Sequence, residues 1–194
     1  MFSDFEKYIQ QQASIDPAEM ELIHSKAIEK TLRRRDILVR EGDVCRYKIF
    51  VTRGLLRAYA TRNDGTEHIV HFSPENTWFT EPESFAQATP SIYSIEALEN
   101  SEVVLWTKND LGYLLEKIPA LNNYFNKLIS RGSHTLRQHL LHIVGSTAEE
   151  KYEAFKVNNA DIFTRVPLHM VASYLGVTRE TLSRIRRSHA MGRN

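Results

Sequence analysis

The chain has 194 residues, of which 42% are hydrophobic, and this composition supports one large or two small packed domains. Its 25 basic and 24 acidic residues leave a net charge of +1, which excludes a protein that binds nucleic acid over its whole surface. No apolar run is long enough to cross a membrane, the first residues are polar, and the single cysteine excludes an intramolecular disulfide. We therefore expect a cytoplasmic protein.

The first 30 residues have helical periodicity, and Asp16, followed by Pro17 and Glu19, is predicted to cap a helix. Six short runs rich in β-branched and aromatic residues then follow between positions 36 and 108: DILVRE, YKIFVTR, LLRAYATR, TEHIVHF, IYSIEAL and EVVLWTK. Asn63-Asp64-Gly65, between two of these runs, predicts a β-hairpin. Strands of this length and spacing indicate an antiparallel sandwich or jelly-roll barrel, whose interior could hold a small ligand.

After Lys108 the apolar period changes to about 3.6, and Pro119 separates a short helix from a long one over about residues 120–144. The long helix has a continuous apolar stripe that one small barrel cannot cover, which predicts a seam between two copies of the chain. The alternative is that the stripe packs only on the barrel. The residues assigned to the seam are Leu121, Phe125, Leu128, Gly132, Leu136, Leu140 and Ile143.

Residues 168–187, LHMVASYLGVTRETLSRIRR, have the pattern of a helix-turn-helix. Gly176 ends the first amphipathic helix, Thr178 is predicted to cap the second, and Leu182 and Ile185 form the buried face of the second helix. The alternative is a helical hairpin whose basic face is merely solvated. The residues predicted to contact DNA in a major groove are Thr178, Arg179, Glu180, Ser183, Arg184 and Arg187.

The distribution of charge favours a helix-turn-helix that binds DNA over a hairpin whose basic face is only exposed to solvent. Residues 162–194 contain six arginines and one glutamate, a net of +5, so the rest of the chain sums to −4. A nearly neutral protein with positive charge concentrated in one segment has a local surface for a polyanion.

This order of a barrel, a long helix and a C-terminal helix-turn-helix resembles the Crp/Fnr family of bacterial transcription regulators. The segments 36–43 (DILVREGD), 47–54 (YKIFVTRG) and 177–185 (VTRETLSRI) are similar to the family's early strands and recognition helix. The resemblance implies an α+β fold, with a cyclic-nucleotide-binding-like domain at 1–118, a dimerisation helix at 119–145 and a DNA-binding domain at 146–194. It places Arg179, Glu180 and Arg184 at the base-reading positions. It also implies a homodimer that binds a palindromic operator, with RNA polymerase and a small-molecule effector as further candidate partners.

The chain departs from the family pattern in two places. Members that bind cyclic AMP have Gly-Glu followed about ten residues later by Arg-Ser or Arg-Thr, whereas this chain has Thr80-Glu81 and then Ser91-Ile92. Without a cation for the phosphate, cyclic AMP is not the expected effector. The candidate effector pocket comprises Thr80, Glu81, Ser84, Phe85, Ser91, Ile92 and Tyr93. In addition, too few residues follow Arg187 for a β-hairpin wing, so we expect DNA contact to depend on the helix.

An enzyme is an alternative class of protein. His68 and His71 lie three apart in a predicted strand, so their side chains point to opposite faces and cannot chelate one metal ion as in a cupin. The chain has no Gly-x-Ser-x-Gly turn and no glycine-rich phosphate loop. We therefore expect no catalytic residues, no metal and no cofactor. The remaining alternative is a ligand sensor whose C-terminal helices bind a protein instead of DNA.

Overall fold

The computed structural model describes the backbone of residues 1–191 and their side chains, except those of 133–144 and 189–191. The chain forms two compact units. The first comprises Met1–Ala60 and His71–Ser130, and the second comprises Thr61–Val70 and Arg131–Asn194. The loop at 61–70, which the sequence placed with the other strands, is therefore grouped with the C-terminal helices.

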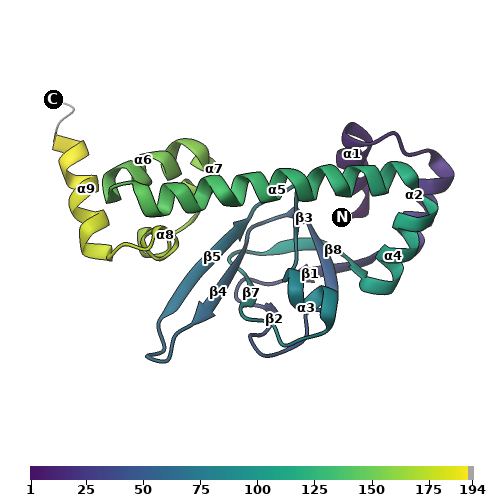
Figure 1. Cartoon of the computed structure of the whole chain (residues 1–194), viewed down its shortest axis with the longest axis horizontal. Coiled ribbons are helices and arrows are strands. Elements are labelled where there is room, and N and C mark those ends of the chain that lie inside the picture. Colours follow the sequence, from purple (N-terminus) through teal and green to yellow (C-terminus); the bar gives the residue numbers. More distant parts are fainter. Residues whose placement is uncertain (192–194) are drawn as a thin grey trace. The chain divides into compact units, whose positions relative to one another are not determined.

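Over the described residues, eight strands form two four-stranded sheets, with the strand orders β1-β8-β3-β6 and β2-β7-β4-β5 (Figure 1). The pairings of β8 with β1 and β3, of β3 with β6, and of β7 with β2 and β4 are antiparallel. The strands are β1 (Ile28–Leu32), β2 (Ile37–Val39), β3 (Tyr47–Arg53), β4 (Leu56–Thr61), β5 (Glu67–Ser73), β6 (Thr77–Phe79), β7 (Ser94–Ala97) and β8 (Ser101–Thr107). The predicted α+β class with antiparallel sheets is confirmed, although β1 and β6 were not predicted.

Helices precede and follow the strands in the sequence, and one helix lies between β6 and β7. They are α1 (Phe2–Gln12), α2 (Pro17–Ser25), α3 (Pro82–Gln87), α4 (Lys108–Lys117), α5 (Pro119–Gly145), α6 (Ala148–Asn158), α7 (Ala160–Arg165), α8 (Leu168–Leu175) and α9 (Arg179–Met191). The predicted cap of α2 is confirmed, because Asp16 and Glu19 each accept a hydrogen bond from the other's backbone amide. Among the described helices, none is both long and apolar enough to span a membrane.

Alternate side chains of β3 and β8 lie in two different apolar layers, one on each face of the sheet β1-β8-β3-β6. Ile49 and Val51 of β3 point into an apolar layer that also contains Ala58 of β4 and Ile95 of β7, from the other sheet. Phe50, between them, points to the opposite face. The core of the first unit therefore consists of two apolar layers.

Aromatic side chains dominate the second of these layers, where helices α1, α2, α4 and the first half of α5 cover the sheet. The ring of Phe5 in α1 lies 5.1 Å from that of Phe50 and 5.0 Å from that of Trp106. The indole of Trp106 donates to the carbonyl of Ile23 in α2 at 3.2 Å. The buried indole N–H is thus satisfied, as the burial of a Trp requires.

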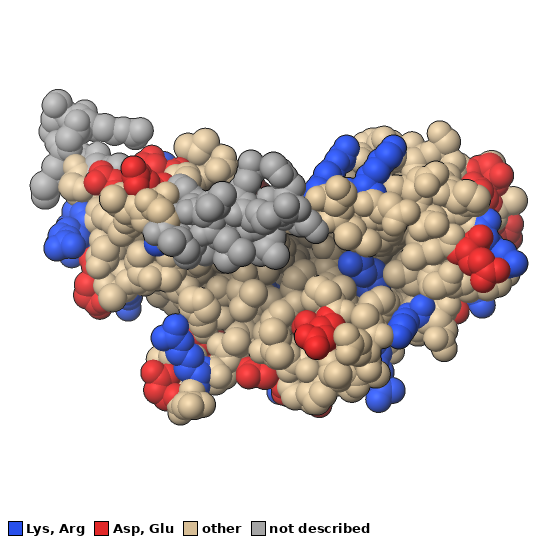
Figure 2. Space-filling view, in the orientation of Figure 1, with Lys and Arg blue, Asp and Glu red and all other residues tan. Residues whose placement is uncertain are grey.

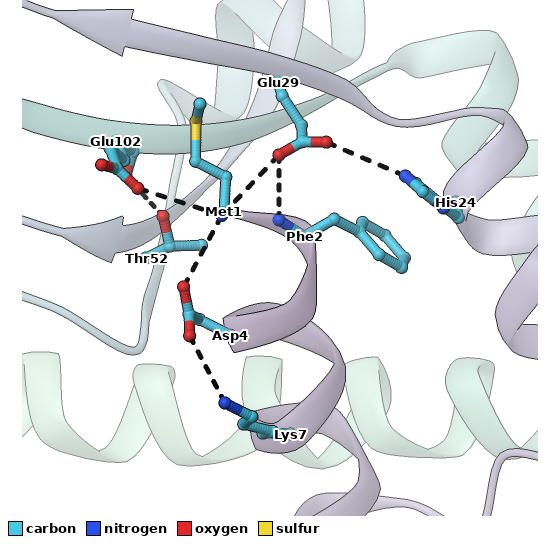
Figure 3. A network of polar contacts seen from close by, with 8 residues as sticks. All are labelled: Met1, Phe2, Asp4, Lys7, His24, Glu29, Thr52 and Glu102. Atoms are coloured by element: carbon cyan, nitrogen blue, oxygen red, sulfur yellow. Dashed lines mark hydrogen bonds and ion pairs between the residues drawn. The ribbon is translucent and has the colours of Figure 1, made fainter.

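Polar contacts hold the first turn of α1 against the sheet (Figure 3). The backbone amide of Phe2 donates to the carboxylate of Glu29 at 3.0 Å, and the amine of Met1 lies 3.6–3.9 Å from the carboxylates of Asp4, Glu29 and Glu102. Acidic side chains near the start of a helix also interact favourably with its unpaired N–H groups. The contacts with Glu29 and Glu102 join α1 to strands β1 and β8.

Candidate DNA interface and effector pocket

Helices α8 and α9 are joined by the tight turn that the sequence predicted. Gly176 has φ +66°, a left-handed conformation that glycine adopts without strain, and the amide of Val177 donates back to the carbonyl of Ala172 at 3.0 Å. The hydroxyl of Thr178 accepts from the amide of Thr181 at 3.1 Å. The predicted glycine stop and threonine cap are both confirmed.

The helix-turn-helix is held by an apolar core of its own. Leu182 and Ile185 on α9 are buried, and so are the expected apolar residues of α8, namely Val171, Ala172 and Leu175. Phe155 of α6 contributes from outside the motif, and its ring lies 5.3 Å from that of Tyr174. The orientation of α9 is therefore determined by packing, which leaves its opposite face exposed.

Every charged residue predicted to contact DNA lies on that exposed face. Arg179, Glu180, Arg184 and Arg187 are exposed, and Ser183 is half-buried. The guanidinium of Arg187 donates to the hydroxyl of Ser183 one turn earlier, at 3.3 Å. On the face of the molecule in Figure 2, basic and acidic side chains are interspersed over the described residues. The residues that the sequence predicted to contact DNA therefore form a row on α9 and its cap.

Polar side chains of the candidate effector pocket form hydrogen bonds with backbone groups of the chain itself. The carboxylate of Glu81 caps α3 by accepting from the amide of Ser84 at 2.5 Å, so it is occupied by the chain itself. The hydroxyl of Ser84 accepts from the amide of Cys45 at 2.7 Å and donates to the carbonyl of Thr89 at 2.6 Å. Glu81 thus has a structural role that the sequence comparison with cyclic-AMP-binding members did not indicate.

The hydroxyl groups of Tyr93 and Ser91 also form hydrogen bonds with backbone carbonyls of the chain. The hydroxyl of Tyr93 donates to the carbonyl of Thr80 at 3.1 Å, and the hydroxyl of Ser91 donates to the carbonyl of Tyr93 at 2.7 Å. Burial, with the nearby charge of Glu81, raises the pKa of the Tyr93 phenol, so this group stays protonated at neutral pH. The tyrosine ring belongs to the apolar layer between the two sheets.

Two residues assigned to the pocket do not take part in this bonded set. Ile92 is 68% exposed, so its assignment to the pocket is wrong: its side chain does not point into the interior. Phe85 is half-buried and packs against the layer under the helices. Segment 80–93 contains no Lys, Arg or His, so it supplies no cation to a phosphate.

The residues assigned to the predicted seam along α5 differ in how deeply they are buried within one chain. Leu121 and Phe125 are 2% and 5% exposed within one chain, where they pack in the core, so assigning them to a seam is wrong. Leu128 is half-buried against the same core, and Gly132 is exposed. On this half of the helix, Ile129 is a large apolar residue with 65% exposure. The side chains of Leu136, Leu140 and Ile143 lie outside the described residues.

The second unit contains a contact that the sequence did not predict. The hydroxyl of Ser173 in α8 donates to the carbonyl of Glu67 at 3.0 Å and accepts from the amide of Ile69 at 2.9 Å. No local pattern signals it, because the partners are more than 100 residues apart in the sequence. It joins the 61–70 loop to the helix-turn-helix.

Comparison with protein families and curated proteins supports this architecture. Residues 29–117 match the model of the cyclic nucleotide-binding domain. The chain is 25% identical over 169 residues to the transcriptional activator protein FnrA of Stutzerimonas stutzeri, an alignment that covers 80% of this chain and 68% of FnrA. It is 26% identical over 183 residues to the nitrogen fixation regulation protein FixK of Bradyrhizobium diazoefficiens, covering 89% of this chain and 76% of FixK.

Among solved structures, FixK2 from Bradyrhizobium japonicum has the same fold. The two chains superpose with a TM-score of 0.70 at 22% identity, over 86% of each. The superposition covers 86% of this chain, which is more than the part up to the end of β8 at Thr107. It therefore also includes helices that follow the sheets.

Proposed function

The chain belongs to the Crp/Fnr family of transcription regulators, and from this we propose that it regulates transcription as a homodimer that binds a palindromic operator through α9. The observation that carries the proposal is the exposed row of Arg179, Glu180, Arg184 and Arg187 on a helix whose opposite face is buried. Arginine pairs with guanine O6 and N7, and glutamate accepts from cytosine N4. We place the protein in the cytoplasm because its partner is chromosomal DNA, and we include RNA polymerase among its partners.

Selection of binding sites from random DNA tests this function. We expect an inverted repeat whose half-sites lie about 34 Å apart, because two-fold symmetry places two copies of α9 in successive major grooves. Arg179→Ala and Arg184→Ala should each weaken binding by about 1–3 kcal/mol and relax the preference at one base position per half-site. Arg187→Ala should weaken binding to all sequences equally and flatten its salt dependence, since we place this residue at a phosphate.

The control is Arg53→Ala, which removes an exposed arginine from β3 in the first unit and should leave DNA affinity unchanged. Recovery of no palindrome, or an unchanged consensus in the Arg179 and Arg184 variants, would contradict base reading by α9. Absence of any salt-sensitive DNA binding by the wild type would instead favour the alternative in which the C-terminal helices bind a protein.

Self-association through α5 is the second element of the proposal. A charge at Ile129, which is 65% exposed in one chain, would be buried without a partner in the dimer. We expect Ile129→Asp to weaken self-association at least about tenfold in sedimentation velocity experiments, since more than about 1.4 kcal/mol is lost. Ile28→Asp, at a 43% exposed position on β1, is the matched control and should remain dimeric. A wild type that is monomeric at micromolar concentration would refute the dimer.

Cyclic AMP is not the effector that we propose, because Glu81 is occupied as a helix cap and the segment around Ser91 supplies no cation. The unknown effector, if the regulator uses one, would have another chemistry. Titration calorimetry with cyclic AMP should give no heat of binding at micromolar nucleotide. Micromolar binding that also raises operator affinity would show that a cation from another element replaces the missing arginine.

A further inference from the structure

The hairpin formed by residues 61–70 is attached to the helix-turn-helix through the outer edge of strand β5. Strand β5 lies at the end of its sheet, next to β4, so its outer edge faces no further strand among the described residues. The carbonyl of Glu67 and the amide of Ile69 belong to residues two apart, which point their backbone groups to the same edge. The hydroxyl of Ser173 bonds both groups, at 3.0 and 2.9 Å, and so replaces a ladder partner.

A pocket of about 370 Å³ lies beside this contact, within the second unit. Arg62, Thr66, Glu67 and His68 line it from the hairpin, and the remaining wall comes from α8, the turn and the first residue of α9. Those residues are His169, Ala172, Ser173, Gly176, Val177, Thr178 and Arg179. The pocket therefore combines side chains from two segments that are distant in the sequence.

The chemistry of this lining suits a phosphate. Arg62 and Arg179 are permanently charged, and His68 and His169 add ring N–H donors. The lining contains one acid, Glu67. The other acid of the hairpin, Asp64, accepts from both the amide and the hydroxyl of Thr66, at 2.9 and 2.6 Å, and these bonds lower the pKa of its carboxyl group.

We propose that the hairpin is part of the DNA interface, and that Arg62, with His169 and Thr178, binds a phosphate of the DNA backbone in this pocket. The inference deepens the proposed function, because a phosphate held beside Arg179 is next to the bases that α9 reads. Such a contact would position the protein on the duplex without reading sequence. Ser173 is a positioning residue in this arrangement, because it holds the hairpin edge against α8.

Fluorescence anisotropy with two duplexes tests the proposal. One duplex is selected by the wild type from random DNA, and the other is a scramble of the same composition. Arg62→Ala should weaken binding to both by about three- to tenfold and reduce the slope of log affinity against log salt by about one, as expected for one lost phosphate contact. Arg53→Ala removes an exposed arginine of the first unit and should change neither quantity.

The role of Ser173 is tested by a pair of variants. Ser173→Ala removes the hydroxyl that bonds the strand edge, and it should weaken binding to both duplexes as much as Arg62→Ala does. Ser173→Thr keeps the hydroxyl and should retain wild-type affinity. The double variant Arg62→Ala/Ser173→Ala should be no weaker than either single variant, because both disable the same hairpin. Unchanged thermal unfolding of each variant excludes a general loss of structure.

Two results would overturn the proposal. Unchanged affinity in Arg62→Ala would mean that no phosphate contacts the hairpin, and higher affinity in Arg62→Ala or Ser173→Ala would mean that the docked hairpin excludes DNA. Failure of the proposed function is a different outcome, in which the wild type binds neither duplex in a salt-sensitive way. If Arg184→Ala loses the selected duplex while Arg62→Ala does not, only the inference about the hairpin fails.

Discussion

Replacement of Arg57 by methionine is expected to destabilise the first unit by about 3–5 kcal/mol, because it leaves a buried carboxylate without its partner. Arg57 and Glu96 lie opposite each other on β4 and β7 and are 7% and 8% exposed. The guanidinium Nε donates to Glu96 Oε2 at 2.8 Å, and the guanidinium carbon lies 4.2 Å from the centre of the Tyr59 ring. Methionine keeps most of the apolar stem, so the loss reports mainly on charge.

Urea unfolding followed by tryptophan fluorescence measures this effect, since Trp78 and Trp106 are the two tryptophans of the chain and both belong to the first unit. The double variant Arg57→Met/Glu96→Leu removes both charges and should unfold within about 1 kcal/mol of the wild type, or be more stable. Arg53→Met, at an exposed position on β3, is the control and should change stability by less than about 0.5 kcal/mol. A similar loss in the single and double variants would refute the ion-pair explanation.

Replacement of Lys48 by methionine should have the opposite sign and stabilise the first unit at pH 7 by about 2–3 kcal/mol. Lys48 pairs with Trp106 across β3 and β8, and no carboxylate among the described residues forms an ion pair with it. Burial lowers its pKa from 10.5 to about 8, an effect that nearby Cys45 partly offsets. At pH 7 the folded chain must therefore keep a poorly solvated ammonium group charged.

The pH dependence follows from the direction of this shift. Between pH 8 and 10.5 the unfolded chain binds the Lys48 proton and the folded chain does not, so the free energy of unfolding rises with pH in this window. The wild type should show the rise and Lys48→Met should not, in urea unfolding at pH 7, 8.5 and about 10. Lys30→Met, at an exposed position on β1, should keep the rise. An identical pH profile in Lys48→Met and wild type would contradict the assignment.

Local patterns in the sequence predicted the elements that depend on neighbouring residues. The cap at Asp16, the hairpin at Asn63-Asp64-Gly65, the break at Pro119, and the turn at Gly176 with its cap at Thr178 all appear in the structure. Each depends on hydrogen bonds or backbone preferences within a few residues, which a sequence pattern records directly.

The sequence did not predict strands β1 and β6, because neither has a clear local pattern. Four of the five residues of β1 are exposed and only Leu32 is buried, so its sequence has no clear alternation of apolar and polar residues. Strand β6 has only three residues. Both are strands because β8 and β3 provide their hydrogen-bonding partners, which come from elsewhere in the chain.

The sequence by itself determined that this protein has antiparallel sheets, a long helix and a basic helix-turn-helix, because amphipathic period, turn residues and charge are local properties. Only the tertiary structure decided what several of those residues do. Phe125 lies in the core of its own chain, Glu81 caps α3, and Ser173 holds the edge of β5. An apolar or polar side chain is equally suited to several partners, and the partner it meets depends on which distant segments the fold brings beside it.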